Sequence, residues 1–320
     1  MSWIALTAAL LSTPVCPAET VAALTSTADT APFRLTCFAT LTPGMTVVRP
    51  VVIEGAEGSG AGLDCRGGAV GRPGAASTTR TPTLSIRSRR DSEGWSRPRG
   101  VRVTDCTLHG NVRIWGLGAE GRIDELRASS RATGHTERAQ AAAPTDIALD
   151  RTTVVATGSI PLYVGPGVTG VTVTGGRFVG RSISTAIYLD AESAGTVIEG
   201  VQFDIVTGRE QIAVDGSAGN RIVGNRFQQA DQGGVFLYRN CGEDGVIRHQ
   251  APTDNLIADN QFEGTSWLRP RVIVVGSREG RRRYCADDAG WPFGSSLDDG
   301  DNAARNVVRN NRTLYRWWPF

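Results

Sequence analysis

The sequence contains no lysine, and all 34 of its basic side chains are arginines. Schiff-base chemistry and a lysine general base are therefore excluded. Acidic residues number 32, so the formal net charge is only +2. A chain this close to neutral has no strong general attraction to phosphate backbones, and we predict no nucleic-acid partner.

Histidine is also scarce, with three residues, and the six cysteines form no Cys-x-x-C pair or Cys/His cluster. A zinc site is therefore not expected. Residues 1–18 have the short apolar core and small-residue ending of a signal peptide, and no later segment is apolar enough to be transmembrane. We predict cleavage near Ala18 and a secreted or periplasmic protein, with residues 19–320 forming one domain.

Glycine is abundant, with 39 residues, and Val, Ile and Thr recur in short runs bounded by Gly, Asn and Asp. This composition predicts many short strands joined by tight turns. An eight-residue pattern also recurs, most clearly in 220–227 and 255–262. Its copies end at Leu108, Val154, Phe178, Phe203, Phe227, Phe262 and Thr313.

The copies are separated by 46, 24, 25, 24, 35 and 51 residues. We interpret steps near 24 as single coils, the step of 46 as two coils, and the longer steps as coils with insertions. A repeat of this length built from short strands indicates a solenoid. Alternating side chains, right-handed parallel crossovers and stacking of turn asparagines favour an all-β, single-stranded right-handed parallel β-helix. We predict an N-terminal cap at about 19–62, coils at about 63–315, and loop insertions at 239–254 and 276–305.

The repeat resembles the parallel β-helix repeats of the pectate-lyase-like superfold. Residues 62–70, Gly-Leu-Asp-Cys-Arg-Gly-Gly-Ala-Val, resemble the Leu-Asp-Cys-Asn-Gly-x-x-Ile opening coil of secreted β-helix proteins. The resemblance covers roughly 35–315 and implies the fold but no single chemistry, because this superfold hosts lyases, hydrolases, epimerases and binding proteins. The motif sets of polygalacturonases and alginate epimerases are absent. The arginine base and Asp-bound Ca²⁺ of pectate lyases are compatible with the composition.

A second strand between the repeat copies also aligns coil by coil. Its rows begin at Leu162, Ile187, Ile212 and Val235, and a fifth begins at Val272. With the first and third residues of each row buried, the second and fourth should face solvent. This alternation predicts two exposed columns, one of Tyr163, Tyr188, Ala213 and Phe236 and one of Gly165, Asp190, Asp215 and Tyr238.

Exposed aromatics beside stacked carboxylates are typical of a saccharide groove, so we predict a polysaccharide partner bound by Tyr163, Tyr188 and Phe236. Asp190 and Asp215 should lie one coil apart, where like charge raises the pKa of one of them. They are candidates for catalytic acid and base, or for ligands of Ca²⁺, the one cofactor that the sequence suggests. The alternative is a solvated Asp ladder with aromatic stacks that only stabilise the solenoid.

The two insertions leave the same strand on neighbouring coils and should lie side by side, braced by a Cys241–Cys285 disulfide. Within them Arg239 and His249 are catalytic candidates. Arginine clusters recognise carboxylates or sulfates, so the substrate-binding candidates here are Arg248, Arg281, Arg282 and Trp291. Glu210 and Tyr238 complete the catalytic candidates. Cys37 and Cys65 flank the expected opening coil and are predicted to pair, which leaves Cys106 as a free thiol.

We interpret the chain as an exported polysaccharide-active protein, most simply a lyase acting on an acidic, uronate-containing glycan. Asp190 and Asp215 would neutralise the substrate carboxylate directly or through Ca²⁺, and Arg239 or His249 would remove the C5 proton, with Tyr238 as acid. A glycoside hydrolase using the Asp pair is one alternative. A non-catalytic glycan-binding or surface protein is another, since the aromatic column alone would suffice. The sequence does not indicate which oligomeric state the protein adopts.

Overall fold

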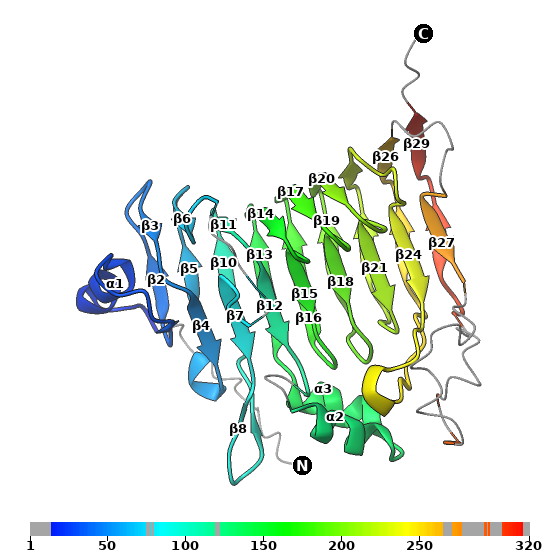
Figure 1. The fold of residues 1–320 in the computed structure, drawn as a ribbon, viewed down its shortest axis with the longest axis horizontal. Coiled ribbons are helices and arrows are strands. Elements are labelled where there is room, and N and C mark those ends of the chain that lie inside the picture. Colours follow the sequence, from blue (N-terminus) through cyan, green and yellow to red (C-terminus); the bar gives the residue numbers. More distant parts are fainter. Residues whose placement is uncertain are drawn as a thin grey trace, which may run out of the picture.

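The computed structural model describes residues 14–74, 78, 80–118, 122–264, 271–276, 291–292, 294 and 303–315. Within them, strands form three parallel sheets of nine strands each, wound into a right-handed parallel β-helix (Figure 1). The fold predicted from the repeat is therefore confirmed. None of the helices in the described part of the chain is long and apolar enough to cross a bilayer.

Each coil contributes one strand to each sheet. The first sheet contains, in spatial order, β1 (Phe33–Arg34), β4 (Val51–Glu54), β7 (Leu84–Arg87), β12 (Val112–Trp115), β15 (Leu162–Val164), β18 (Ile187–Leu189), β21 (Ile212–Asp215), β24 (Val235–Tyr238) and β27 (Ile273–Val275). The second contains β2 (Phe38–Thr40), β5 (Gly62–Asp64), β10 (Arg102–Thr104), β13 (Thr145–Asp150), β16 (Thr169–Thr174), β19 (Val197–Glu199), β22 (Arg221–Val223), β25 (Leu256–Ala258) and β28 (Val307–Arg309). The third contains β3 (Thr46–Val47), β6 (Ala69–Val70), β11 (Thr107–His109), β14 (Thr153–Gly158), β17 (Arg177–Ser182), β20 (Gln202–Thr207), β23 (Arg226–Phe227), β26 (Gln261–Gly264) and β29 (Arg312–Tyr315).

The last residues of the repeat copies stack in register in the third sheet, as predicted. Phe178, Phe203, Phe227 and Phe262 pair successively along the sheet. Their rings stack with centroids 5.2, 4.5 and 4.5 Å apart, and all four are fully buried. This column fills the core with large apolar side chains and holds the coils in one register.

The 46-residue step between Leu108 and Val154 is a single coil with an insertion, so the prediction of two coils is wrong. The two residues pair directly between β11 and β14. The intervening residues instead form α2 (Ile123–Ser130) and α3 (His135–Ala142). Figure 1 shows these helices at the edge of the β-helix from which the yellow segment after β24 also projects.

Two asparagine ladders stabilise the turns of the C-terminal coils, as the sequence predicts. The backbone N–H of Asn220 donates to Oδ1 of Asn255, and that of Asn225 donates to Oδ1 of Asn260, both at 2.9 Å. The same contacts continue to Asn306 and Asn311 in the last coil. The side-chain amides thereby satisfy backbone groups that the turns would otherwise leave unpaired.

The N-terminal disulfides join Cys16 to Cys37 and Cys65 to Cys106. The predicted Cys37–Cys65 pair and the free thiol at Cys106 are therefore wrong. Cys37 precedes β2 whereas Cys65 follows β5, so these two cysteines lie at opposite ends of paired strands. Cys65 and Cys106 both follow strands that pair with each other, which brings their sulfurs together.

The N-terminal cap is shorter than predicted. α1 (Ala18–Thr25) buries Leu24, and the first coil already begins at β1, well before residue 63. Cleavage near Ala18 would remove Cys16 and leave Cys37 without its partner. The signal peptide remains a prediction of the sequence, and the Cys16–Cys37 disulfide favours a cleavage site before Cys16.

Candidate functional site

The first sheet carries the predicted aromatic column. Tyr163 pairs with Tyr188, and their rings stack with centroids 6.0 Å apart. Ala213 pairs with Phe236 in the following coils. The fifth row is shifted by one residue from the prediction, because β24 pairs with β27 starting at Ile273.

The aromatic residues of the column are half-buried, and Ala213 and the carboxylates beside the column are buried, so the predicted exposure is wrong. Asp190 is 7% exposed and Asp215 is 0% exposed. They do lie on adjacent coils, since β18 pairs with β21 in register. The insertion that follows β24, residues 239–254, contacts both carboxylates through Arg248 and covers them. We call this insertion the strap.

Arg248 occupies the position between the two carboxylates. Its Nη1 lies 2.6 Å from Oδ1 of Asp190 and 3.1 Å from Oδ2 of Asp215. The hydroxyl of Tyr163 donates to Asp190, and that of Tyr188 donates to Asp215. Burial raises the pKa of Asp215, and attraction to Arg248 opposes this rise.

This arrangement does not fit the predicted Ca²⁺ site. A guanidinium already supplies the positive charge between the carboxylates, which leaves no room for a cation there. Among the described residues, no group of three or more His, Cys, Asp or Glu side chains is placed to hold a metal ion. The predicted role of Arg248 as a free substrate ligand changes accordingly, because its charge is paired inside the protein.

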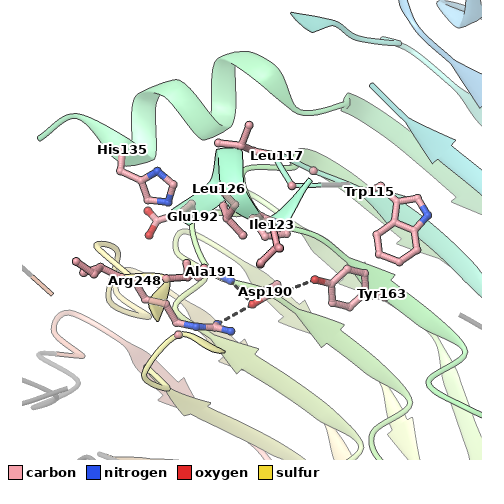
Figure 2. A pocket seen from close by; sticks show the side chains of 16 residues that line it. Trp115, Leu117, Ile123, Leu126, His135, Tyr163, Asp190, Ala191, Glu192 and Arg248 are labelled. Carbon is pink, nitrogen blue, oxygen red and sulfur yellow. Dashed lines mark hydrogen bonds and ion pairs between the residues drawn. The ribbon is translucent and has the colours of Figure 1, made fainter. Parts of the chain in front are cut away.

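A pocket of about 170 Å³ lies beneath the strap, between the first sheet and α2 and α3. Figure 2 shows Asp190 at its floor, bonded to Tyr163 on one side and Arg248 on the other, with His135 and Glu192 nearby. Its lining consists of Trp115, Gly116, Leu117, Gly118, Ile123, Leu126, His135, Tyr163, Pro166, Asp190, Ala191, Glu192, Gly242, Val246, Ile247 and Arg248.

Glu192 brings a second carboxylate to this pocket and was not predicted from the sequence. It lies on the tight bend after β18, where its φ of 63° is left-handed. Its Oε1 accepts the backbone N–H of His249 at 2.7 Å, and the hydroxyl of Thr136 on α3 donates to its Oε2. Burial raises the pKa of Glu192. The only feature of the sequence that points to Glu192 is its position two residues after Asp190, at the end of an aligned strand.

His249 anchors the strap. Its Nε2 lies 2.7 Å from the carbonyl oxygen of Ser130, so this nitrogen carries the proton and donates it. The ring also packs edge-on against His135, with centroids 5.1 Å apart. His249 does not line the pocket. The structure therefore gives it a role in fixing the strap to α2 and does not support the predicted general base.

Three further catalytic candidates lie outside the pocket, in the coil of β24. The Tyr238 hydroxyl donates to Oε1 of Glu210 at 2.9 Å and accepts from Arg209 at 2.6 Å. Tyr238, Glu210 and Arg239 are each buried to 95% or more. None of the three lines the pocket beneath the strap, which favours a structural role for them over contact with a sugar bound there.

The second insertion is described only in part. Arg281, Arg282 and Cys285 lie outside the described residues, whereas Cys241 is disulfide-bonded. Trp291 packs its ring over the guanidinium of Arg131 at 5.4 Å and does not line the pocket. A Cβ added to Gly294 would lie 2.4 Å from the carbonyl oxygen of Arg248, so Gly294 lies against the strap.

Acidification should destabilise the strap–helix contact through His135. Burial, with repulsion from His249 and Arg138, lowers the pKa of His135 to about 3. Between pH 6.5 and 3 the unfolded chain therefore binds this proton and the folded one does not, so stability falls as pH falls. In the wild type, the free energy of unfolding should decrease by on the order of 3 kcal/mol over this window because of His135, and His135→Gln should abolish this decrease. The measurement is the unfolding midpoint as a function of pH. His109→Gln should leave most of the loss in place.

Comparison with known proteins identifies no protein family model and no curated protein that matches this chain. Solved structures do resemble it. A Dettilon tailspike protein matches at TM-score 0.44 and 10% identity, over 89% of this chain and 54% of that one, so the present chain spans about half the tailspike's length. DFA-IIIase from Arthrobacter chlorophenolicus matches at 0.43 and 12%, over 88% and 79% of the two chains. The Streptococcus pneumoniae surface protein and adhesin PfbA matches at 0.40 and 11%, over 92% and 91%. At these values no substrate or reaction is transferred to the present chain.

Proposed function

We propose that this protein is an exported glycan-active enzyme that hydrolyses polysaccharide at the pocket beneath the strap. The observation that carries the proposal is that Asp190 and Glu192 line one small pocket whose wall includes Trp115 and Tyr163. Export is supported by the two N-terminal disulfides, which persist in oxidising compartments.

The pocket has the size and lining of a site for one sugar residue. At about 170 Å³ it is smaller than the roughly 300–1,000 Å³ of drug-sized ligand sites. Trp115 and Tyr163 lie with ring centroids 5.7 Å apart and offer apolar faces on which sugar C–H groups pack. Nε of Arg248 is buried with no hydrogen-bond partner among the described residues. A substrate hydroxyl at the pocket would satisfy it.

The two carboxylates have the different environments that acid–base cleavage of a glycosidic bond requires. Burial raises the pKa of Glu192, so it is the candidate for the protonated acid. Asp190 instead lies 2.6 Å from the guanidinium of Arg248, so it is the candidate for the base or nucleophile. Asp215 is fully buried and serves as a counter-charge to Arg248.

Elimination at a uronate, the simplest interpretation of the sequence, has less support than hydrolysis. A lyase needs a free positive charge to neutralise the substrate carboxylate, and the charge of Arg248 is already paired with two aspartates. A uronate in the pocket would also be repelled by Asp190. Mass analysis of the products separates these reactions, because hydrolysis adds water to the products whereas elimination leaves an unsaturated sugar that absorbs in the ultraviolet.

Trp115→Ala should weaken binding of glycans to the protein by about tenfold, since loss of an aromatic platform costs about 1.4 kcal/mol. The measurement is retention or titration against a panel of soluble polysaccharides. Trp291→Ala is the matched control, because Trp291 lies outside the pocket lining. Equal affinity of the wild type and the Trp115 variant would contradict the proposal, and binding without any product would leave a glycan-binding protein.

A further inference from the structure

A second hollow of about 530 Å³ adjoins the pocket on the same sheet. The two share Trp115 and Gly118 in their linings. The second hollow extends along β12, β7 and β4, toward the N-terminal coils, and is lined there by Ser85, Arg87 and Val52. A glycan with one residue in the pocket would therefore place a neighbouring residue in this second hollow, on the other side of Trp115.

The second hollow has the opposite charge to the pocket. Arg80 and Arg87 line it, and no carboxylate does so among the described residues. Arg87 donates to Glu54 at 2.6 Å. Arg80 is exposed, and no described residue forms an ion pair or hydrogen bond with its side chain. Its guanidinium thus faces the hollow with its donors available.

The surroundings reinforce this positive charge. Glu54 is shared by Arg87 and Arg34, and Glu57 is shared by Arg34 and Arg89. With Arg80 added, four guanidinium groups face two carboxylates, a formal excess of +2. At the pocket, in contrast, the single guanidinium of Arg248 is shared by Asp190 and Asp215, a formal excess of −1.

On the basis of the proposed function, we infer that the substrate is an acidic heteropolysaccharide in which Arg80 binds a carboxylate or sulfate on the sugar next to the one in the pocket. A guanidinium recognises either group with two parallel hydrogen bonds. The pocket itself favours an uncharged sugar, because an anionic one would meet Asp190, and the charge of Arg248 there is already shared by two aspartates. The arrangement selects a charged residue beside a neutral one and disfavours polymers made only of uronate.

The test measures binding on arrays of acidic heteropolysaccharides printed native, after carboxyl reduction and after desulfation, together with polygalacturonate. Arg80→Gln should lower affinity for the native glycans by about tenfold and leave affinity for the uncharged derivative unchanged. Arg80→Lys should restore part of the loss. Arg72→Gln is the matched control, since Arg72 is exposed, makes the same charge change and does not line the hollow.

The derivative that loses binding identifies the anion, because carboxyl reduction removes a uronate and desulfation removes a sulfate. Equal binding of native and uncharged glycans by the wild type, or an equal loss in the Arg72 variant, overturns the inference while the proposed function stands. Stronger binding of polygalacturonate than of any heteropolysaccharide also overturns it. Absence of binding to every glycan overturns both.

Discussion

Arg248→Leu is expected to lower the free energy of unfolding by about 3–5 kcal/mol at neutral pH and to abolish activity, because it leaves two buried carboxylates without their counter-charge. The Nη1 group of Arg248 contacts both Asp190 and Asp215. It is also one of the contacts that hold the strap over the first sheet, together with the bond from the His249 backbone N–H to Glu192. Chemical denaturation with activity measured on the same samples gives both quantities.

The destabilisation should depend on pH in a defined direction. Burial already raises the pKa of Asp215, and removal of Arg248 takes away the attraction that opposes this rise. A carboxyl group whose pKa is raised by folding destabilises the folded state when it is ionised. The loss of stability in the Arg248 variant should therefore be largest at pH 7 and should shrink as pH falls toward the pKa of the unfolded chain. Adding Asp190→Asn and Asp215→Asn to the leucine variant should restore much of the stability.

The matched control is Arg305→Leu, which removes an arginine that binds Asp254 with two bonds of 2.6 Å at the surface. Its ion pair is exposed and screened by solvent, so little change is expected. Equal stability of the Arg248 and Arg305 variants would show that the strap is not held by this ion pair.

Asp190→Asn and Glu192→Gln are each expected to lower kcat by about 10²–10⁴-fold, the range for loss of a general acid or base. Burial raises the pKa of Glu192. Wild-type activity should fall as pH rises through this pKa, because Glu192 then loses the proton that it would donate. Glu192→Gln should remove this alkaline limb, whereas a purely structural defect would lower activity at every pH alike. Initial rates across the pH range, with folding checked by circular dichroism, give the comparison.

Asp204→Asn provides the control for these variants, because Asp204 is an ion-paired aspartate on the third sheet, bonded to Arg177 at 2.7 Å. Its turnover should match the wild type. If Asp190→Asn retained full turnover and Asp204→Asn did not, the assignment of the pocket as the catalytic site would be wrong.

The register of the coils could be predicted from the sequence because it follows from local pattern. Phe178, Phe203 and Phe227 recur at nearly constant spacing, and a parallel solenoid converts that spacing into direct contact. The same rule placed Tyr163 beside Tyr188 and Asp190 one coil from Asp215. Contacts between neighbouring coils are in this sense local contacts.

Contacts made by insertions follow no repeat and were missed. Arg248 lies 58 residues from Asp190, and no periodicity indicates that it folds back over the sheet. The helices that complete the pocket are not predicted, because the 46-residue step is interpreted as two coils and so leaves no insertion for them. The alternation along β18 correctly predicts that Asp190 points away from the core. Its exposure also depends on what covers the sheet, and the strap covers Asp190.

Arg80 and Trp115 were missed for a related reason. Trp115 lies at the end of β12, in register with Arg87 of β7, and the 46-residue step to the next repeat copy hides its alignment with the rows that begin at Leu162. The pairing of β12 with β15 places Trp115 in the column that contains Gly165 and Asp190. No repeat predicts Arg80, which lies on a turn before β7.

The most direct test is a crystal structure of the Glu192→Gln variant soaked with an oligosaccharide that the wild type cleaves. We expect one sugar ring between Trp115 and Asp190 beneath the strap, with a hydroxyl on Nε of Arg248. A sugar bound only on another face of the β-helix, with this pocket holding water alone, would contradict the assignment.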